Sequence, residues 1–344
     1  MKKNTKNILI TGAAGFIGYS LCKSLLDSNF NIIGIDNIND FYDVNLKLDR
    51  LKDLGIDKSN ALKAKVLSSS SIFGEKLKFL KMNLENKDEL DNLFKNGKFD
   101  VVCNLAAQAG VRYSIENPYA YIDSNIIAFI NILECCRHYK VSKLVYASSS
   151  SVYGKNDNIP FSEYENVDKP VSLYAATKKS NELMAHTYSH LYKFETIGLR
   201  FFTVYGPWGR PDMALFLFTK AIINNKKIDV FNYGNHSRDF TYIDDIIYGV
   251  KKIISNESKD KSLYKIYNIG NTKPVKLLDF ISLIEKNLNK SCEKNLLPMQ
   301  LGDVGKTFSD TSKLEKDYGY KPNTSIEKGV ENFINWYLSY YNIK

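Results

Sequence analysis

The chain has 344 residues, of which 44% are hydrophobic and 25% are charged, and it carries a formal net charge of +9 at pH 7. This composition is ordinary for a soluble globular protein whose length allows a large buried core. The basic residues are mostly lysines scattered among asparagines and form no basic block, which argues against a nucleic-acid partner.

Cysteine usage and hydropathy restrict the cellular setting. The five cysteines lack the spacing of metal ligands, and most lie in apolar surroundings, so we expect reduced thiols in a cytoplasmic protein. The apolar run after Lys6 reaches Gly12 after only four residues, and no run approaches the length of a membrane span. We therefore expect no membrane association. His186 and His190 lack a third ligand at suitable spacing, so we also expect no metal site.

A glycine-rich turn follows the first expected strand, residues 7–11. Residues 12–18 read Gly-Ala-Ala-Gly-Phe-Ile-Gly, and apolar residues then recur at helical spacing through Leu26. Backbone amides at such a helix start favour a phosphate, and the glycines allow close approach of a pyrophosphate. A second expected strand, residues 31–35, ends at Asp36, which suits an adenosine ribose and favours NAD over NADP. The expected NAD contacts here are Gly12, Ala14, Gly15, Phe16, Ile17, Gly18, Asp36, Asn37 and Asn39.

Residues 37–79 are too long for an ordinary connection inside a doubly wound sheet. The segment is rich in lysine and contains a run of four serines at 68–71. We interpret it as an insertion, partly helical and partly loop, that forms a solvated excursion.

Strands and helices then alternate along the chain. The expected strands are residues 77–82, 99–105, 143–147 and 196–202, and the expected helices are residues 88–95, 117–139 and 174–192. Such alternation predicts right-handed βαβ units and an α/β fold with a Rossmann-like, doubly wound parallel sheet. Small residues at 106–110 follow one strand, where they let a cofactor lie flat against the backbone.

Tyr174 and Lys178 lie four residues apart on one expected helix. This spacing places both side chains on one helix face, where the ammonium could lower the pKa of the phenol. A phenolate formed in this way is a general base. A serine run at residues 148–151 ends the preceding strand and supplies hydroxyl groups for the same site.

The pattern changes after residue 203. Residues 207–213 form a loop broken by glycine and proline, and mixed short elements follow. We expect residues 1–203 to form the NAD-binding Rossmann domain, with the insertion at 37–79. Residues 204–344 are expected to form a smaller mixed α/β region that binds the substrate, with chain crossings between the two parts.

With these motifs, the chain resembles the extended short-chain dehydrogenases/reductases that act on nucleotide sugars. Within that group it is most similar to the UDP-glucuronate 4-epimerases of bacterial capsule and lipopolysaccharide synthesis. The resemblance covers the whole chain and rests on residues 11–18, 105–112, 148–154, Tyr174 with Lys178, 200–213, 238–242 and 302–304. It implies NAD as cofactor, a UDP-sugar as substrate, and a homodimer packed through residues 117–139 and 174–192.

The resemblance also implies roles for particular residues. Tyr174 would be the base on the sugar 4-hydroxyl, and Lys178 would tune its pKa and bind the nicotinamide ribose. Ser149 and Ser151 are both open as the catalytic hydroxyl, with Ser151 favoured. Further cofactor contacts would be Asn83, Leu84, Leu105, Ala106, Ala107, Gln108 and Asn125, although family members commonly have an aspartate where Asn83 stands. Substrate contacts would be Arg112, Ser149, Ser150, Ser151, Thr203, Arg210, Val230, Phe231, Arg238 and Asp303.

The hypothesis is a transient 4-keto sugar that is reduced again on its other face. A 4-ketone makes the glucuronate carboxylate prone to loss as carbon dioxide, and a bidentate arginine, Arg210, is suited to hold it. Related decarboxylases typically carry a glutamate just before residues 152–154, where this chain has Ser151. The alternatives are a 4-epimerase of a neutral or N-acetylated UDP-hexose, a UDP-glucuronate decarboxylase, and an NAD-binding protein without turnover.

Overall fold

The larger part of the molecule is built on an eight-stranded sheet. The computed structural model describes residues 5–343. The strands of this sheet are β1 (Lys6–Thr11), β2 (Phe30–Asp36), β3 (Ser68–Ser70), β4 (Gly74–Lys81), β5 (Val101–Asn104), β6 (Lys143–Ser149), β7 (Glu195–Phe201) and β11 (Tyr264–Ile269). Their order is β11-β7-β6-β5-β1-β2-β4-β3, and every neighbouring pair is parallel except β3 with β4. This confirms the predicted doubly wound α/β fold.

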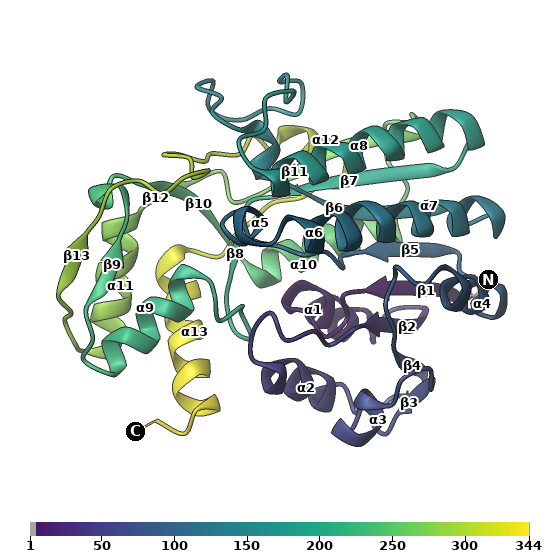
Figure 1. The fold of residues 1–344 in the computed structure, drawn as a ribbon, viewed down its shortest axis with the longest axis horizontal. Coiled ribbons are helices and arrows are strands. Elements are labelled where there is room, and N and C mark those ends of the chain that lie inside the picture. The colour runs from purple at the N-terminus through teal and green to yellow at the C-terminus, as the bar shows by residue number, and fades with distance from the viewer. Residues whose placement is uncertain (1–4, 344) are drawn as a thin grey trace.

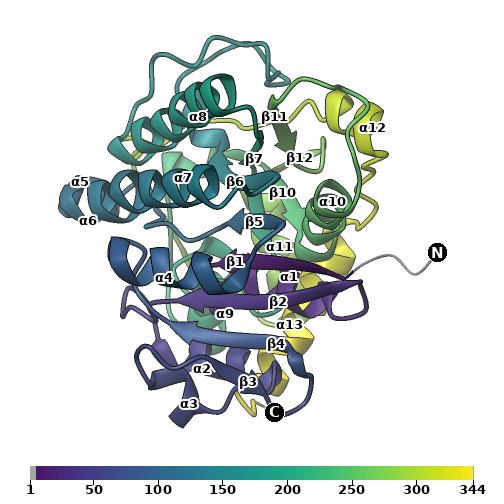
Figure 2. The same cartoon turned by 90° about the vertical axis from the view of Figure 1, so that its right-hand side faces the viewer.

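Helices cover both faces of this sheet (Figures 1 and 2). On one face lie α4 (Lys87–Gly97), α7 (Ala128–His138) and α8 (Leu173–Tyr192), and on the other lie α1 (Phe16–Leu25) and α10 (Ile243–Ser255). Successive side chains of a strand point to opposite faces. In β1, Leu9 therefore packs with α4 and α7, whereas Ile8 and Ile10 pack with α1 and α10. Burial on both faces explains why the strands read as continuous apolar runs.

A smaller region lies beside the carboxyl ends of these strands (Figure 1). Its strands are β8 (Thr203–Tyr205), β9 (Ile228–Val230), β10 (Ser237–Tyr242), β12 (Pro274–Lys276) and β13 (Lys294–Leu296). Its main helices are α9 (Ala214–Ile223), α11 (Leu277–Leu288) and α13 (Ile326–Tyr340). The strands form the sheets β12-β10-β8 and β13-β9. Because β11 joins the large sheet and α10 packs on α1, the chain crosses between the two regions.

The shorter elements complete the chain. They are α2 (Val44–Asp53), α3 (Lys58–Leu62), α5 (Tyr113–Glu116), α6 (Pro118–Ile122), the π-helical turn η1 (Asp123–Ile127), the 3-10 turns η2 (Ser150–Tyr153) and η3 (Asn232–Gly234), and α12 (Ser312–Tyr318). Within residues 5–343, no helix combines the length and the apolar character that crossing a membrane would require.

The insertion is not the solvated excursion that the sequence suggests. In α2, the side chains of Leu46, Leu48, Arg50 and Leu51 are at most 4% exposed. The segment is rich in lysine overall, but α2 has an apolar face that packs into the main core. The segment therefore contributes a buried wall next to the glycine turn.

The expected helix at residues 117–139 is interrupted. The structure divides it into α6, η1 and α7, because the chain makes a π-helical turn around Asn125. A π-helical turn releases backbone groups from the regular helix ladder. The carbonyl of Asn125 instead accepts a hydrogen bond of 2.6 Å from the side-chain amide of Asn181 on α8.

Candidate active site

The glycine turn lies where the strand order reverses, at the carboxyl ends of β1 and β5. Gly12 has a φ of +72°, and a Cβ on it would lie 2.9 Å from the backbone nitrogen of Ala106. A Cβ on Gly18 would lie 2.1 Å from the carbonyl oxygen of Gly12. Both positions therefore require glycine. Such a crevice at the switch point of a doubly wound sheet is where dinucleotides bind.

Asp36 stands at the end of β2 and faces this turn. Its carboxylate accepts hydrogen bonds from the backbone nitrogens of Ala14, at 3.1 Å, and Ile38, at 2.8 Å. The carbonyl and side-chain oxygens of Asn39 are held by the Lys47 ammonium at 2.7 and 2.6 Å. Asp36, the predicted ribose-binding acid, thus lies beside the predicted phosphate turn. Lys47 of the insertion holds Asn39, which is also among the expected cofactor contacts.

The remaining expected cofactor residues line the ends of β4 and β5. Ala106 donates its backbone N–H to the Thr11 hydroxyl at 3.0 Å, which fixes the small residues after β5 against β1. Asn125 is buried and holds both backbone groups of Gln108, at 2.8 and 3.0 Å. Leu84 is buried, whereas Asn83 is exposed at the loop that follows β4.

Tyr174 and Lys178 both lie on α8, which begins with Ser172 accepting a hydrogen bond from the backbone nitrogen of Ala175. The Lys178 ammonium donates a 2.8 Å hydrogen bond to the carbonyl of Ala147 on β6. Burial lowers the pKa of Lys178 to about 8. The pKa of Tyr174 is raised by burial, and it is lowered in part by a hydrogen bond from Ser149 and by a nearby charge, that of Arg210.

This electrostatic arrangement differs from the expectation that Lys178 lowers the pKa of Tyr174. The Lys178 ammonium points to the end of β6, while Ser149 and Arg210 are the groups that favour the phenolate of Tyr174. The spacing correctly predicted that Tyr174 and Lys178 lie on one helix. It could not predict that the Lys178 ammonium donates its hydrogen bond to the carbonyl of Ala147.

The side chains of the serine run at residues 148–151 point in different directions. Ser148 points away to Glu182, at 2.7 Å, whereas hydrogen bonding by Ser149 is among the influences that lower the pKa of Tyr174 against burial. Ser151 lies 3.1 Å from the Ser149 hydroxyl, oxygen to oxygen, and donates its backbone N–H to that hydroxyl. Although the sequence alone favours Ser151, the structure makes Ser149 the stronger candidate for the hydroxyl partner. Ser150 begins the turn η2 that separates them.

Arg210 lies within the loop broken by glycine and proline, which follows β8, the strand that begins at Thr203. The guanidinium forms two hydrogen bonds with the carboxylate of Asp212, at 3.1 Å from Nε and 2.5 Å from Nη2. It also lies 5.9 Å from the ring centre of Phe41, a residue of the insertion. The charge of Arg210 also acts on Tyr174, whose pKa it lowers against the larger effect of burial.

The other expected substrate residues gather in the smaller region. Arg238 forms an ion pair with Asp303, 2.9 Å from Nη2 to Oδ1. Arg112 stacks over the ring of Phe231 at 5.1 Å. Burial lowers the pKa of Arg238, Asp303 opposes this, and the charge of Arg112 lowers the pKa further. Two guanidiniums beside an aromatic ring and a carboxylate are suited to a diphosphate with its nucleoside. The side chain of Val230 is fully buried in β9, so only its backbone can take part.

Several residues near the site were not predicted from the sequence to belong to it. Arg50 of the insertion donates hydrogen bonds both to the hydroxyl of Tyr42 and to the loop of Arg210. Lys47 is near Arg50 and Arg210: burial lowers its pKa, Asp36 opposes this, and the two guanidiniums lower it further. The signal that could have revealed them is the scarcity of arginine, since Arg50 is the single arginine between residues 37 and 79.

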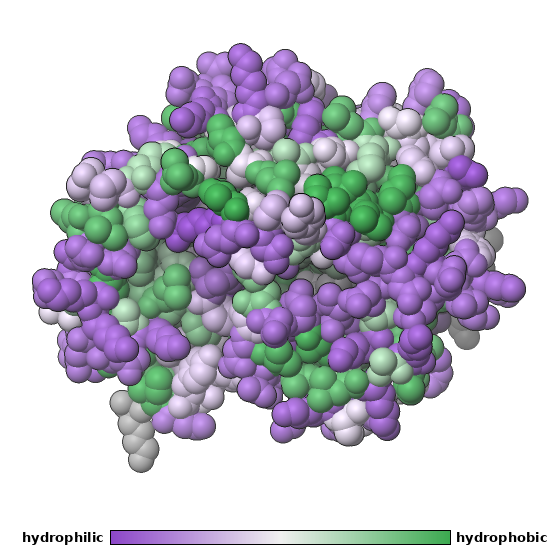
Figure 3. Space-filling view, viewed as in Figure 1, coloured by the Kyte–Doolittle hydropathy of each residue, from purple (hydrophilic) through white to green (hydrophobic). Residues whose placement is uncertain are grey.

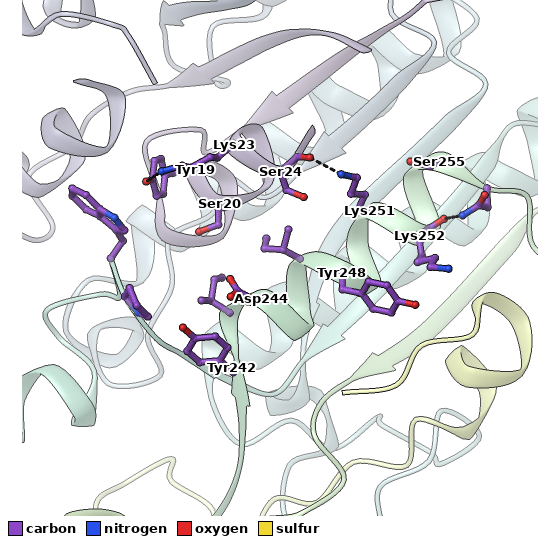
Figure 4. A pocket seen from close by; sticks show the side chains of 15 residues that line it. Tyr19, Ser20, Lys23, Ser24, Tyr242, Asp244, Tyr248, Lys251, Lys252 and Ser255 are labelled. Carbon is purple, nitrogen blue, oxygen red and sulfur yellow. Dashed lines mark hydrogen bonds between the residues drawn. The ribbon is translucent and has the colours of Figure 1, made fainter. Parts of the chain in front are cut away.

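One groove of the surface is separate from the candidate catalytic residues. It has a volume of about 770 Å³ and lies between α1 and α10 (Figure 4). Tyr19, Lys23 and Asp244 line it, and Lys251 crosses it to reach the carbonyl of Ser24 at 2.6 Å. Tyr174 and Lys178 are not among its lining residues. Among residues 5–343, no cluster of three or more His, Cys, Asp or Glu side chains could hold a metal ion.

The fold and this set of side chains define a nucleotide-binding α/β enzyme of the short-chain dehydrogenase type. Residues 8–270 match the model of the NAD dependent epimerase/dehydratase family, and the chain belongs to this family. It is 52% identical to Protein CapI of Staphylococcus aureus, covering 97% of this chain and 99% of that protein. It is 43% identical to UDP-glucuronate 4-epimerase 4 of Arabidopsis thaliana, covering 98% of this chain and 77% of that protein.

The fold is similar to solved structures as well. The crystal structure of UDP-glucuronic acid 4-epimerase from Bacillus cereus, in complex with UDP-glucuronic acid and NAD, superposes with a TM-score of 0.87 at 34% sequence identity. The match covers 97% of this chain and all of that one. The two regions of the molecule are therefore arranged as in an enzyme that binds both ligands.

Proposed function

We propose that this protein is a UDP-glucuronate 4-epimerase that interconverts UDP-glucuronate and UDP-galacturonate with enzyme-bound NAD. Similarity over the whole chain to enzymes of that name supports the reaction. One observation carries the choice of a uronate: the charge of Arg210 reaches the phenol of Tyr174. Carbons 4 and 6 of a hexose are separated by one carbon. A cation whose charge acts on the base for the 4-hydroxyl is therefore suited to serve the 6-carboxylate as well.

The residues at the switch point fit NAD. The cradle formed at Gly12 and Gly18, which a Cβ would fill, allows a pyrophosphate to approach the backbone, and Asp36 suits the adenosine ribose. The small residues Ala106 and Ala107 suit the ring system, and Lys178 suits the nicotinamide ribose. When bound, NAD would accept the hydride from carbon 4 and later return it.

The side chains divide the remaining work. Tyr174 takes the proton of the 4-hydroxyl and returns it to the ketone, and Ser149 stabilises the phenolate by its hydrogen bond. Arg112 and Arg238 hold the diphosphate, and Asp303 binds the uridine ribose. Because the sugar is held through its diphosphate, the 4-keto ring can turn and present its other face without leaving the site.

Arg210 protects the intermediate from decarboxylation. Loss of carbon dioxide needs the C5–C6 bond to align with the carbonyl π system, and a bidentate contact can hold the carboxylate away from that alignment. Asp212 occupies the edge of the guanidinium formed by Nε and Nη2. The edge formed by Nη1 and Nη2 is the one that the substrate carboxylate would use, with the Thr203 hydroxyl beside it. Ser150 and Ser151 supply no carboxylic acid for elimination.

The assembly and the pathway are further parts of this proposal. Exposed apolar side chains lie on the helices expected at the dimer interface, and Figure 3 shows apolar surface over α7 and α8. They are Tyr119, Ile122, Ile127, Leu183 and Leu191. A homodimer would bury them. The similarity to CapI favours capsule synthesis over lipopolysaccharide synthesis, and a cytoplasmic enzyme would meet both NAD and UDP-sugars.

The function is tested by incubating the purified protein with UDP-glucuronate, without added NAD, and identifying the products by anion exchange and NMR. We expect a mixture of UDP-glucuronate and UDP-galacturonate that reaches the same ratio from either starting compound. Accumulation of UDP-xylose or of a 4-keto pentose would identify a decarboxylase instead. If nothing changes even with added NAD, the proposal is wrong and neutral UDP-hexoses become the next substrates to test.

A further inference from the structure

Arg50 is a fully buried arginine that joins three segments of the chain. It lies on α2 of the insertion, and its side chain has no exposed area. Nη1 donates hydrogen bonds to the carbonyl of Ala14 at 2.9 Å and to the hydroxyl of Tyr42 at 2.7 Å. Nη2 donates to the carbonyls of Trp208 at 2.7 Å and Gly209 at 3.2 Å. The glycine turn, the insertion and the loop before Arg210 therefore meet at one guanidinium.

The partners of Arg50 make this burial unusual. All four acceptors are neutral, and among residues 5–343 no carboxylate forms an ion pair with it. Its Nε has no hydrogen-bond partner within the described part of the chain. Burying a charge without an opposite charge is costly. Arg50 must therefore have a role that offsets this cost, and its contacts with the loop that carries Arg210 indicate one.

The loop before Arg210 needs such support. Trp208 has a φ of +63°, in the left-handed region that a bulky side chain rarely adopts. Such a conformation persists only where the surroundings hold it. The carbonyls of Trp208 and Gly209, the two residues directly before Arg210, both accept hydrogen bonds from Arg50. Phe41 of the same insertion lies against the Arg210 guanidinium.

We propose that Arg50 is a positioning residue for substrate recognition: it fixes the backbone of Trp208 and Gly209 so that Arg210 meets the 6-carboxylate of a uronate. The insertion at residues 37–79 is thereby a specificity element for uronates and also links this loop to the NAD turn through Ala14. This inference rests on the proposed function, because it assigns Arg210 to the carboxylate.

The product distribution reports the position of Arg210. If the carboxylate of the 4-keto sugar is held loosely, its C5–C6 bond can break. The electron pair of that bond enters the carbonyl to form an enolate, carbon dioxide leaves, and a proton from water adds at carbon 5. The product is a UDP-4-keto-pentose, and the hydride stays with the nicotinamide as NADH. A misplaced Arg210 therefore diverts turnovers from epimerisation to decarboxylation, which a loss of general stability would not do.

The test compares Arg50→Lys, Arg50→Met and the milder Tyr42→Phe with the wild-type protein on UDP-glucuronate. We expect the fraction of turnovers that end in the pentose, and the KM for UDP-glucuronate, to rise about tenfold for the Arg50 variants and less for Tyr42→Phe. Reduced nicotinamide should accumulate in step with the pentose. In the ligand-free protein, amide hydrogen exchange at residues 208–213 should accelerate. Lys52→Met, an exposed change on the same helix, should leave all these quantities unchanged.

The outcomes separate this inference from the proposed function. If the wild-type protein does not epimerise UDP-glucuronate, both fail. If it does, and Arg50→Lys and Tyr42→Phe keep the wild-type product ratio, KM and hydrogen exchange, the positioning role is wrong. If Arg50→Met does not fold, the other two variants decide. Loss of bound NAD with an unchanged product ratio would show that Arg50 acts on the glycine turn alone, which would also overturn the inference.

Discussion

Glu182 and Arg200 form a bidentate ion pair inside the molecule, with Nε 2.8 Å from Oε1 and Nη2 2.9 Å from Oε2. Both side chains are at most 4% exposed. The pair joins α8 to β7, and the same carboxylate accepts the hydroxyl of Ser148, the neighbour of Ser149. Glu182 lies one turn beyond Lys178 and two turns beyond Tyr174 on α8. The ion pair thus holds the helix that carries the catalytic groups against the strands that supply the serines.

Replacing Glu182 by glutamine should destabilise the protein strongly. The variant leaves the Arg200 charge buried without an opposite charge, which costs about 3–5 kcal/mol when a buried pair is broken. Urea unfolding curves measure the change. The matched control is Glu293→Gln, which breaks an exposed pair with Lys227 and should cost no more than about 1 kcal/mol. Equal effects of the two variants would show that the buried pair does not support the fold.

Tyr174→Phe should lower kcat by about 10²- to 10⁴-fold, the usual contribution of a general acid or base. The phenyl ring keeps the shape of the side chain, so the melting temperature and the amount of bound NAD should stay the same. Steady-state epimerisation of UDP-glucuronate measures kcat. Tyr188→Phe on the same helix removes a hydroxyl that bonds to Glu134 and should keep kcat within about twofold. If Tyr174→Phe retained wild-type turnover, another base would have to be found.

Ser149→Ala should reduce kcat more than Ser151→Ala. The hydroxyl of Ser149 bonds to Tyr174 and lowers its pKa, so its loss leaves burial unopposed by a hydrogen bond and raises the pKa of the base. We expect the pH at which kcat rises to move upward for Ser149→Ala and to stay in place for Ser151→Ala. The pH dependence of kcat decides between the two serines. The reverse order would restore Ser151, the choice favoured by sequence alone.

Lys178→Met should abolish activity and yet stabilise the protein at neutral pH. Burial lowers the pKa of Lys178 from the ordinary 10.5 to about 8, so between these values the unfolded state binds more protons and wild-type stability rises with pH. Below pH 8 the full penalty is present, about 3 kcal/mol, and the lost hydrogen bond to Ala147 offsets about 1 kcal/mol of it. Urea unfolding at several pH values should show the advantage of the variant shrinking above pH 8. An advantage that did not change with pH would contradict this assignment.

Arg238→Met should weaken substrate binding without affecting NAD. The change removes the ion pair with Asp303 and the proposed diphosphate contact, and truncating a buried charged partner costs about 2 kcal/mol or more, so Kd for UDP should rise at least about 30-fold. Titration calorimetry with UDP measures Kd, and cofactor content is read by absorbance. Lys306→Met, an exposed lysine near the same loop, is the control. Parallel loss of NAD would show a structural rather than a binding role.

Features whose information lies within a short stretch of chain could be predicted from the amino-acid sequence. The strand, glycine turn and helix at residues 6–25 follow from local periodicity, and Asp36 follows from the length of one βα unit. Tyr174 and Lys178 follow from the geometry of a single helix. The alternation of strands and helices was enough to predict the doubly wound sheet. In each case the residues that matter are neighbours along the backbone, so their spacing alone carries the information.

Features that depend on the direction of a side chain or on contacts between distant segments became visible only in the folded chain. Whether Ser149 or Ser151 meets Tyr174 depends on how β6 passes into η2, since a continuing strand would point both side chains to one face and the turn separates them. Arg50 meets Trp208 and Gly209 across nearly half the chain, and nothing local to the lysine-rich insertion indicates such partners. A periodic pattern shows which face of an element is apolar. Only the folded structure shows which groups form hydrogen bonds with a buried charged side chain, because those groups can come from any part of the chain.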